Sequence, residues 1–276
     1  PEGFANSLKV AVTTADTSLA AGQYENIAHL IEAQNLQNLA FGTSDAKNIT
    51  VSFYVKSNKT GTYAFNISQS DNSSKQATLN YTINSANTWE RKSLTFTGDT
   101  SGVINDDNGR GLHLIWFLAA GSTYNSGSAS ATFQTYANAD YAAGQAVNVL
   151  DSTDNTWFLT GCQLEVGQNA TTFEHEPVER TLSKCERYFQ KGAFARRWTS
   201  NGSNEYNFFT HYYVTQMRAT PTKTFSGGSF SNVISSTENA SDELLSGVAM
   251  QLAYRANSAD TDTFVFGRDV TFDSEL

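Results

Sequence analysis

The sequence predicts an all-β protein: a jelly-roll β-sandwich, one linking α-helix and then a smaller antiparallel β domain. Composition is the first observation behind this fold class. Only 16% of the residues are charged and 39% are hydrophobic, while Ser, Thr, Asn, Gln and Gly are abundant, as in short strands joined by polar turns. The second observation is that apolar and polar residues alternate repeatedly, which is the period of a strand with one buried face.

Alternating runs occupy most of the first part of the chain. Their apolar positions are Leu8, Val10 and Val12; Ile49, Val51, Phe53 and Val55; Tyr63, Phe65 and Ile67; Leu79, Tyr81 and Ile83; Leu94 and Phe96; Leu112, Leu114, Trp116 and Leu118; and Trp157, Leu159, Cys162, Leu164 and Val166. Turn residues such as Asn58-Lys59-Thr60-Gly61 separate them. Ile115 and Phe117 are apolar on the other face, so we expect that strand to be buried on both sides. Because no helix alternates with the strands, a sandwich over residues 1–176 is predicted.

One helix is expected over residues 177–192, with its core near 178–190. Pro177 suits a first helical turn, and Gly192 suits a stop. The stripe between them is apolar at Val178, Leu182, Cys185 and Phe189. Alternation then resumes, which predicts an antiparallel β domain over residues 193–276. This domain is small, so we expect it to bury Phe208, Phe209, Tyr212 and Tyr213 and to complete its core with subunit contacts.

Several function classes find no support in the sequence. The net charge of −9 and the absence of a basic stripe argue against nucleic acid as a partner. No apolar run is long enough for membrane insertion. The chain has neither a nucleophile elbow nor a phosphate-binding loop, and no pair of acidic residues stands out for glycoside hydrolysis. We therefore expect no catalytic residues and no enzyme activity, although sequence alone leaves glycan hydrolysis open.

No metal site or other cofactor is expected, with calcium left as an alternative. The four histidines are scattered, which argues against a zinc site. Two acidic turns contain the oxygen ligands that calcium uses: one has Asp106, Asp107 and Asn108, and the other has Asp151 and Asp154. Ordinary turns use the same residue types, and neither turn has the spacing of a known calcium loop. Cys162 and Cys185 are interpreted as two buried thiols, and a disulfide between them stays open. Because the chain begins at Pro1 without Met, we expect a trimmed chain or a fragment of a longer polypeptide.

The segment Ala119–Val149 is the candidate binding region, and the outer loops of the C-terminal domain are the alternative location. It is rich in Gly, Ser, Ala and Asn, and we expect a long loop that projects from the sandwich and holds one strand near 131–136. Tyrosine rings offer apolar faces to sugars, and amides bond to sugar hydroxyls. The candidate ligand-binding residues are Tyr124, Asn125, Gln134, Tyr136, Asn138 and Tyr141. Two alternatives are that the tyrosines only anchor their own loop, or that the loop packs on a neighbouring protein.

Three motifs in succession resemble bacteriophage tail-fibre and virion-appendage proteins. Within the run 157–177, Gln163-Leu164-Glu165-Val166-Gly167 is similar to the Gln-Leu-Glu-x-Gly strand of that family. Phe173-Glu174-His175-Glu176-Pro177 is similar to the Phe-Glu-x-Arg-Pro segment that follows the strand there, with His175 in place of the commoner Arg. Cys185-Glu186-Arg187-Tyr188-Phe189 resembles the helix that follows there. Met217-Arg218-Ala219-Thr220-Pro221-Thr222 resembles the signature after that helix. Val51–Lys56 and Thr88–Arg91 are similar to carbohydrate-binding-module-like jelly rolls, so the likeness spans about residues 1–222.

The resemblance implies a structural and adhesive protein on the virion surface, in a tail fibre or a capsid-surface appendage. It also implies a homotrimer in contact with other virion proteins. The motifs carry no catalytic residues and name no ligand, and host-surface glycan is the partner that we expect. The alternatives are a purely structural capsid decoration or fibre connector, and a glycan-degrading tailspike module.

Overall fold

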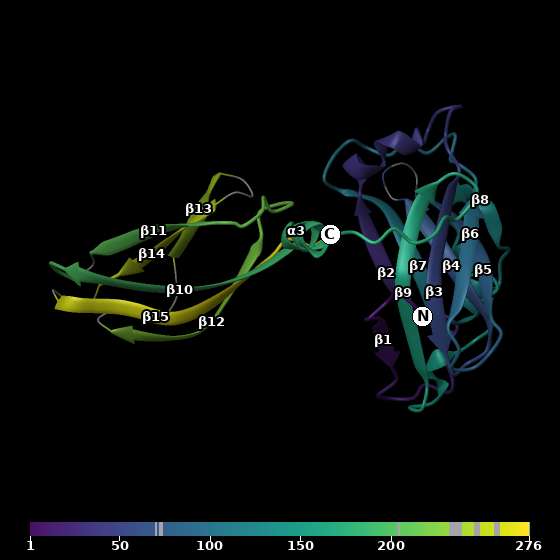
Figure 1. Ribbon diagram of the computed structural model, residues 1–276, viewed down its shortest axis with the longest axis horizontal. Coiled ribbons are helices and arrows are strands. Elements are labelled where there is room, and N and C mark those ends of the chain that lie inside the picture. The colour runs from purple at the N-terminus through teal and green to yellow at the C-terminus, as the bar shows by residue number, and fades with distance from the viewer. Residues whose placement is uncertain are drawn as a thin grey trace. The chain divides into compact units, whose positions relative to one another are not determined.

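The computed structural model describes residues 1–69, 71, 74–203, 205–231, 239–245, 249–256 and 260–275. The chain divides into two compact units, Pro1–Glu174 and His175–Glu275 (Figure 1). Antiparallel strands dominate both units, so the predicted fold class is confirmed. None of the helices in these described ranges has the length and apolarity that a membrane-spanning helix needs.

The first unit is a β-sandwich of two antiparallel sheets (Figure 1). The four-stranded sheet has the order β1 (Leu8–Ala11), β9 (Thr156–Val166), β3 (Ile49–Ser57) and β6 (Glu90–Phe96). The five-stranded sheet has the order β2 (Tyr24–Glu32), β7 (Arg110–Ala120), β4 (Gly61–Gln69), β5 (Lys75–Ile83) and β8 (Ser130–Thr135). Apart from the β4–β5 hairpin, neighbouring strands in the two sheets are not consecutive in the chain, as in a jelly roll.

Aromatic side chains from both sheets meet in the core of this sandwich. The indole of Trp116 lies 4.9 Å from the ring of Phe65 and 5.7 Å from the ring of Phe53, between ring centroids. All three side chains are buried, as the alternation predicts. Truncating such a ring to Ala costs about 3–5 kcal/mol, so these rings are a main source of the unit's stability.

The two open edges of the sandwich differ. At one edge, β6 and β8 approach each other, and Thr97 N donates to Ala131 O at 2.9 Å. At the other edge, β1 pairs with β9 only as far as the Leu8–Leu159 pair. A β-bulge then interrupts β9 at Gly161, whose φ of +58° is suited to glycine. Beyond this bulge, the edge of β9 has no strand partner on the β1 side among the described residues.

Strand β2 is absent from the sequence prediction. Its inward-facing positions are Ile27, His29 and Ile31, since they pair with the inward-facing Trp116, Leu114 and Leu112 of β7. A histidine in the middle of this face hides the alternation, and a register shift between Glu25 and Asn26 shortens it further. The 3-10 helix η1 (Ala33–Leu39) follows and buries Ala33, Leu36 and Leu39.

The expectation of a long loop projecting from the sandwich over Ala119–Val149 is wrong. The segment contains α1 (Ser122–Asn125), β8 near the expected strand, α2 (Asn138–Tyr141) and η2 (Val149–Asp151). It folds back on the outer face of β7, where Ile115 and Phe117 pack with Ala64 and Ala142. The apolar outer face of β7 drives this docking, and the prediction that β7 is buried on both sides is confirmed.

The helix is shorter than predicted. It forms α3 (Val178–Glu186), whereas Phe189 to Gly192 belong to strand β10 (Phe189–Ser200). Phe189 begins the pairing of β10 with β15, opposite Asp273. Backbone pairing with a distant strand therefore overrides the local helical stripe at this point.

The second unit holds two three-stranded antiparallel sheets. The first has the order β10, β15 (Asp260–Asp273) and β12 (Thr222–Ser231), and the second has the order β11 (Tyr206–Tyr212), β14 (Ala249–Arg255) and β13 (Asn239–Leu245). Tyr213 is buried with Met217, Val270 and Phe272, as expected for Tyr213. Tyr212 is exposed, contrary to prediction, because neighbouring residues of an extended chain point to opposite sides. The side chains of Phe208 and Phe209 lie outside the described part.

Candidate functional site

The structure brings the three tyrosines of the candidate binding region together with a fourth, Tyr24. We call Tyr24, Tyr124, Tyr136 and Tyr141 the tyrosine cluster. The ring centroids of Tyr24 and Tyr124 are 4.8 Å apart, those of Tyr24 and Tyr141 are 5.6 Å apart, and those of Tyr136 and Tyr141 are 5.5 Å apart. All three pairs meet edge to face, which is a favoured geometry for aromatic rings.

Short helices and backbone hydrogen bonds position the cluster. Tyr124 lies in α1 and Tyr141 in α2, and Ala142 N donates to Tyr124 O at 2.8 Å. Below them, the ring of Phe117 on β7 lies 5.0 Å from that of Tyr141. The cluster is therefore supported by the five-stranded sheet and does not depend on a free loop.

The cluster has an exposed part and a supporting part. Tyr24 is 41% exposed and Tyr136 is 39% exposed, whereas Tyr124 and Tyr141 are half-buried. Burial raises the pKa of Tyr141 above its usual value, and the neighbouring Tyr24, Tyr136 and Tyr124 add to the rise. Burial also raises the pKa of Tyr136, followed by the effects of Tyr124 and Tyr24. The phenols of Tyr136 and Tyr141 are therefore neutral at physiological pH and can both donate and accept hydrogen bonds.

The predicted amides mostly hold the segment together. Asn125 Nδ2 donates to Ala120 O and to Gln145 O, both at 3.0 Å. Gln134 Nε2 donates to Asp140 Oδ2 at 3.5 Å. Asn138 is exposed at the first residue of α2. Of the six predicted residues, Tyr136 and Asn138 are thus the ones most accessible to a ligand.

A second aromatic surface lies on the four-stranded sheet and is covered differently. Lys56 Nζ lies 4.4 Å from the centroid of the Phe158 ring and 5.1 Å from that of Trp89. A cation over an aromatic face is itself a favourable contact. The ammonium group therefore occupies ring faces that a sugar would need, which distinguishes this surface from the tyrosine cluster.

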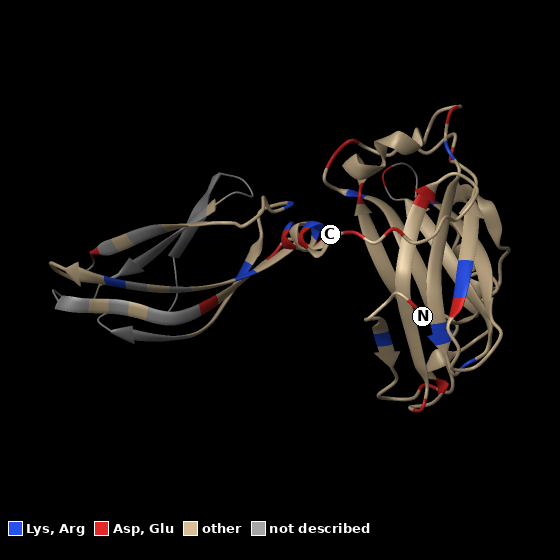
Figure 2. Cartoon of the chain, viewed as in Figure 1, with Lys and Arg blue, Asp and Glu red and all other residues tan. Residues whose placement is uncertain are grey.

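The two acidic turns are used for internal contacts. Asp107 Oδ1 accepts from Gly109 N at 2.8 Å, as in a tight turn. Asp151 accepts from Lys59 Nζ at 2.6 Å and from Asn155 Nδ2 at 2.7 Å. Across the described ranges, no three side chains of His, Cys, Asp or Glu gather as a metal site would require. Charged residues of the first unit occur mainly at strand ends and in connecting loops (Figure 2).

Both cysteines carry free thiols and are exposed, so their interpretation as buried thiols is wrong. Cys185 lies in α3, none of whose residues is buried. Cys162 faces the interior of the sandwich, but an opening between the sheets makes it accessible. Sequence reasoning missed this opening and also missed Tyr24, because both depend on where β2 lies against other strands.

Comparison with known proteins yields little. No protein-family model matches the chain, and no curated protein matches it. One solved structure that matches is recombinant discoidin II of Dictyostelium discoideum, with 9% sequence identity and a TM-score of 0.24 over 95% of this chain and 81% of that one. A TM-score at this level supports no inference about function.

Proposed function

We propose that this protein is a non-enzymatic structural and adhesive component of a bacteriophage virion, and that it binds host-surface glycan through the tyrosine cluster. The virion assignment rests on the succession of sequence motifs between residues 157 and 222. The glycan assignment rests on one structural observation. Tyr24 and Tyr136 present partly exposed rings from a cluster that the sheet holds in place.

This geometry fits weak recognition of sugars. A sugar ring stacks its C–H face on a tyrosine ring, while neutral phenol hydroxyls and the exposed Asn138 amide offer hydrogen bonds to its hydroxyls. The cluster stands on the outer face of a sheet, so a glycan would be held from one side. We expect a dissociation constant of about millimolar to micromolar per subunit, with adhesion arising from many copies on one particle.

A purely structural role is the second candidate. The observation that favours it is that Asn125 and Gln134 donate inside the protein and that the tyrosines pack on one another. In that case the exposed rings would contact a neighbouring virion protein. A glycan-degrading module is the third candidate, and the described residues contain no feature that favours it.

Binding of the chain to immobilised bacterial lipopolysaccharides, capsular polysaccharides and teichoic acids tests the proposal. The variant is Tyr136→Ala, because its ring is exposed and its removal spares the half-buried Tyr124 and Tyr141. The matched control is Trp89→Ala, which removes an aromatic ring from the other sheet. We expect a bound glycan whose signal falls at least about tenfold in Tyr136→Ala and stays unchanged in Trp89→Ala.

Absence of any glycan signal, with the chain folded and multimerised on beads, would contradict the adhesive role and favour the structural one. Shortened products after incubation with a bound polysaccharide would favour the degrading enzyme. Gold-labelled antibody against the chain, imaged on intact particles of the source phage, tests the virion assignment separately. Labelling of host cells alone, with unlabelled particles, would overturn it.

A further inference from the structure

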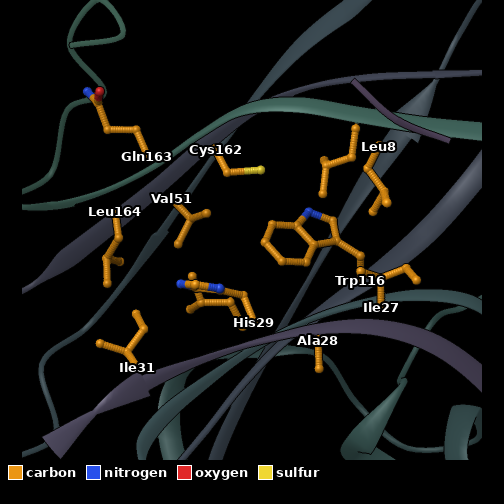
Figure 3. Close-up of a pocket in the computed structure, with 12 residues that line it drawn as sticks. Leu8, Ile27, Ala28, His29, Ile31, Val51, Trp116, Cys162, Gln163 and Leu164 are labelled. Carbon is orange, nitrogen blue, oxygen red and sulfur yellow. The ribbon is translucent and has the colours of Figure 1, made fainter. Parts of the chain in front are cut away.

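A cavity of about 420 Å³ opens between the two sheets of the first unit (Figure 3). Small-molecule sites have volumes of about 300–1,000 Å³, so its size falls in that range. Both sheets contribute to its lining of twelve residues, among them His29 and Ile31 of β2, Trp116 of β7, and Cys162, Gln163 and Leu164 of β9. It lies on the inner side of β2, whereas the tyrosine cluster lies over the outer face of β7.

The strand register explains why the sandwich is open here. Strand β1 covers β9 only up to Leu159, and the Gly161 bulge then turns Cys162 and Leu164 toward the interior. Across the gap, His29 and Ile31 of β2 face inward from the edge of the other sheet. These four side chains line the cavity, yet none is fully buried, so its mouth lies between β2 and β9.

The lining is mainly aliphatic, and its polar members beside the Trp116 indole are Cys162, Gln163 and, at the mouth, His29. None of the twelve residues is Asp, Glu, Lys or Arg. Cys162 is reached through the mouth, but its thiol is surrounded by the cavity walls, and this desolvation raises the pKa of the thiol to about 12, so it stays protonated. The Gln163 amide is held by the chain after β9, since its Nε2 donates to Thr171 Oγ1 at 3.2 Å and its Oε1 accepts from Glu174 N at 2.8 Å. A charged molecule would find no counter-charge from a carboxylate, lysine or arginine there.

One polar group in the cavity lacks a partner. Trp116 is 2% exposed, and its Nε1 has no hydrogen-bond acceptor among the described residues. Figure 3 shows the indole among the side chains that line the cavity, with its nitrogen on the side of Cys162. Buried N–H donors are nearly always paired with protein or water, so this nitrogen calls for an acceptor inside the cavity.

We propose that the cavity binds a small, neutral, largely apolar molecule with one carbonyl or hydroxyl oxygen that accepts a hydrogen bond from Trp116 Nε1. The aliphatic walls select the apolar body, and the unpaired donor selects the oxygen. At about 30 Å³ for each non-hydrogen atom, the volume admits at most about fourteen such atoms. This site is independent of the glycan proposal and occupies the other side of the five-stranded sheet.

The test uses two probes of nearly equal shape, 2-acetylnaphthalene and 2-isopropenylnaphthalene, of which only the first carries an oxygen acceptor. Calorimetric titration of the full chain should give a dissociation constant about fivefold lower for the acetyl probe, which is the usual worth of one hydrogen bond. In ¹H–¹⁵N spectra, the indole signal of Trp116, assigned by its loss in Trp116→Phe, should move downfield with the acetyl probe alone. Trp116→Phe should bind both probes equally.

Two variants on β2 localise the site. His29→Phe narrows the mouth, and Leu30→Phe is its matched control because Leu30 points to the opposite face of the strand. We expect at least about tenfold weaker binding of both probes to the first variant, and less than twofold change in the second. Absence of binding, equal affinity for the two probes in the unmodified chain, or full affinity in a folded His29→Phe variant would each overturn the proposal. The probe comparison needs no variant, so it decides the matter even if Trp116→Phe does not fold.

Discussion

Tyr24 and Tyr124 pack edge to face with ring centroids 4.8 Å apart, although one begins β2 and the other lies in α1. This contact joins the edge strand of the five-stranded sheet to the segment that carries the other tyrosines. Aromatic pairs of this kind contribute about 0.5–1.5 kcal/mol beyond the area they bury. Tyr24 is thus both an exposed ring of the candidate site and a tether for its supporting segment.

Tyr24→Ala should loosen the segment over residues 121–146. We expect the free energy of unfolding to fall by about 1–2 kcal/mol, since the ring is only partly buried. Amide hydrogen exchange in this segment should accelerate more than exchange in β3 and β4. Tyr24→Phe is the control, because it keeps the ring and should keep the exchange pattern. Unchanged exchange in Tyr24→Ala would show that the segment is held without Tyr24.

Gly161→Ala should destabilise the first unit. The φ of Gly161 is +58°, and an added Cβ would lie 2.7 Å from a ring carbon of Phe4. We expect a loss of about 1–3 kcal/mol in the free energy of unfolding, measured by urea denaturation. Gly22→Ala is the matched control, since nothing lies within 4 Å of its added Cβ. Equal midpoints for the two variants would contradict the role assigned to the bulge.

Tyr63 should make stability depend on alkaline pH. Burial raises the pKa of Tyr63 to about 12, with Asp151 adding to the rise and a hydrogen bond with Ser57 opposing it. A raised pKa in the folded state means that the stabilisation is complete below pH 10 and is lost as the pH rises through 12. The loss amounts to roughly 3 kcal/mol for two pKa units.

Urea denaturation of Tyr63→Phe and the unmodified chain between pH 8 and pH 12 measures this effect. At pH 8 the variant should be about 1 kcal/mol less stable, because Tyr63 Oη no longer donates to Lys59 O. The difference between the two proteins should shrink and then reverse toward pH 12. A constant difference over the whole range would show that Tyr63 does not carry the alkaline dependence.

The apolar stripe of α3 is the surface that we expect to lie between subunits of the proposed homotrimer. Val178 is 78% exposed and Leu182 is 54% exposed. Light scattering at micromolar concentration should give the mass of three chains, and the double variant Val178→Ser/Leu182→Ser should lower it. Glu179→Ser/Arg180→Ser, on the polar side, should not. A stable monomer of the unmodified chain would rule out the trimer.

Local patterning was sufficient for most of the sandwich. Alternation predicts strands wherever one face is uniformly apolar, as at Val51, Phe53 and Val55, which are all buried. It failed at β2, where His29 interrupts the inner face, and at Phe189, where pairing with Asp273 replaces the helix. In both cases a partner strand far along the chain decides the conformation, and no local window contains that information.

The sequence by itself determined the fold class, the positions of most core residues and the three tyrosines worth attention. These properties depend on composition and on periods of two residues, which are local. Only the tertiary structure decided that Tyr24 joins Tyr124 and Tyr141, and that Trp116 faces a cavity and not a closed core. Both follow from the register of β2 on β7 and from the short reach of β1 along β9, because pairing between distant strands determines which side chains meet and which edges stay open.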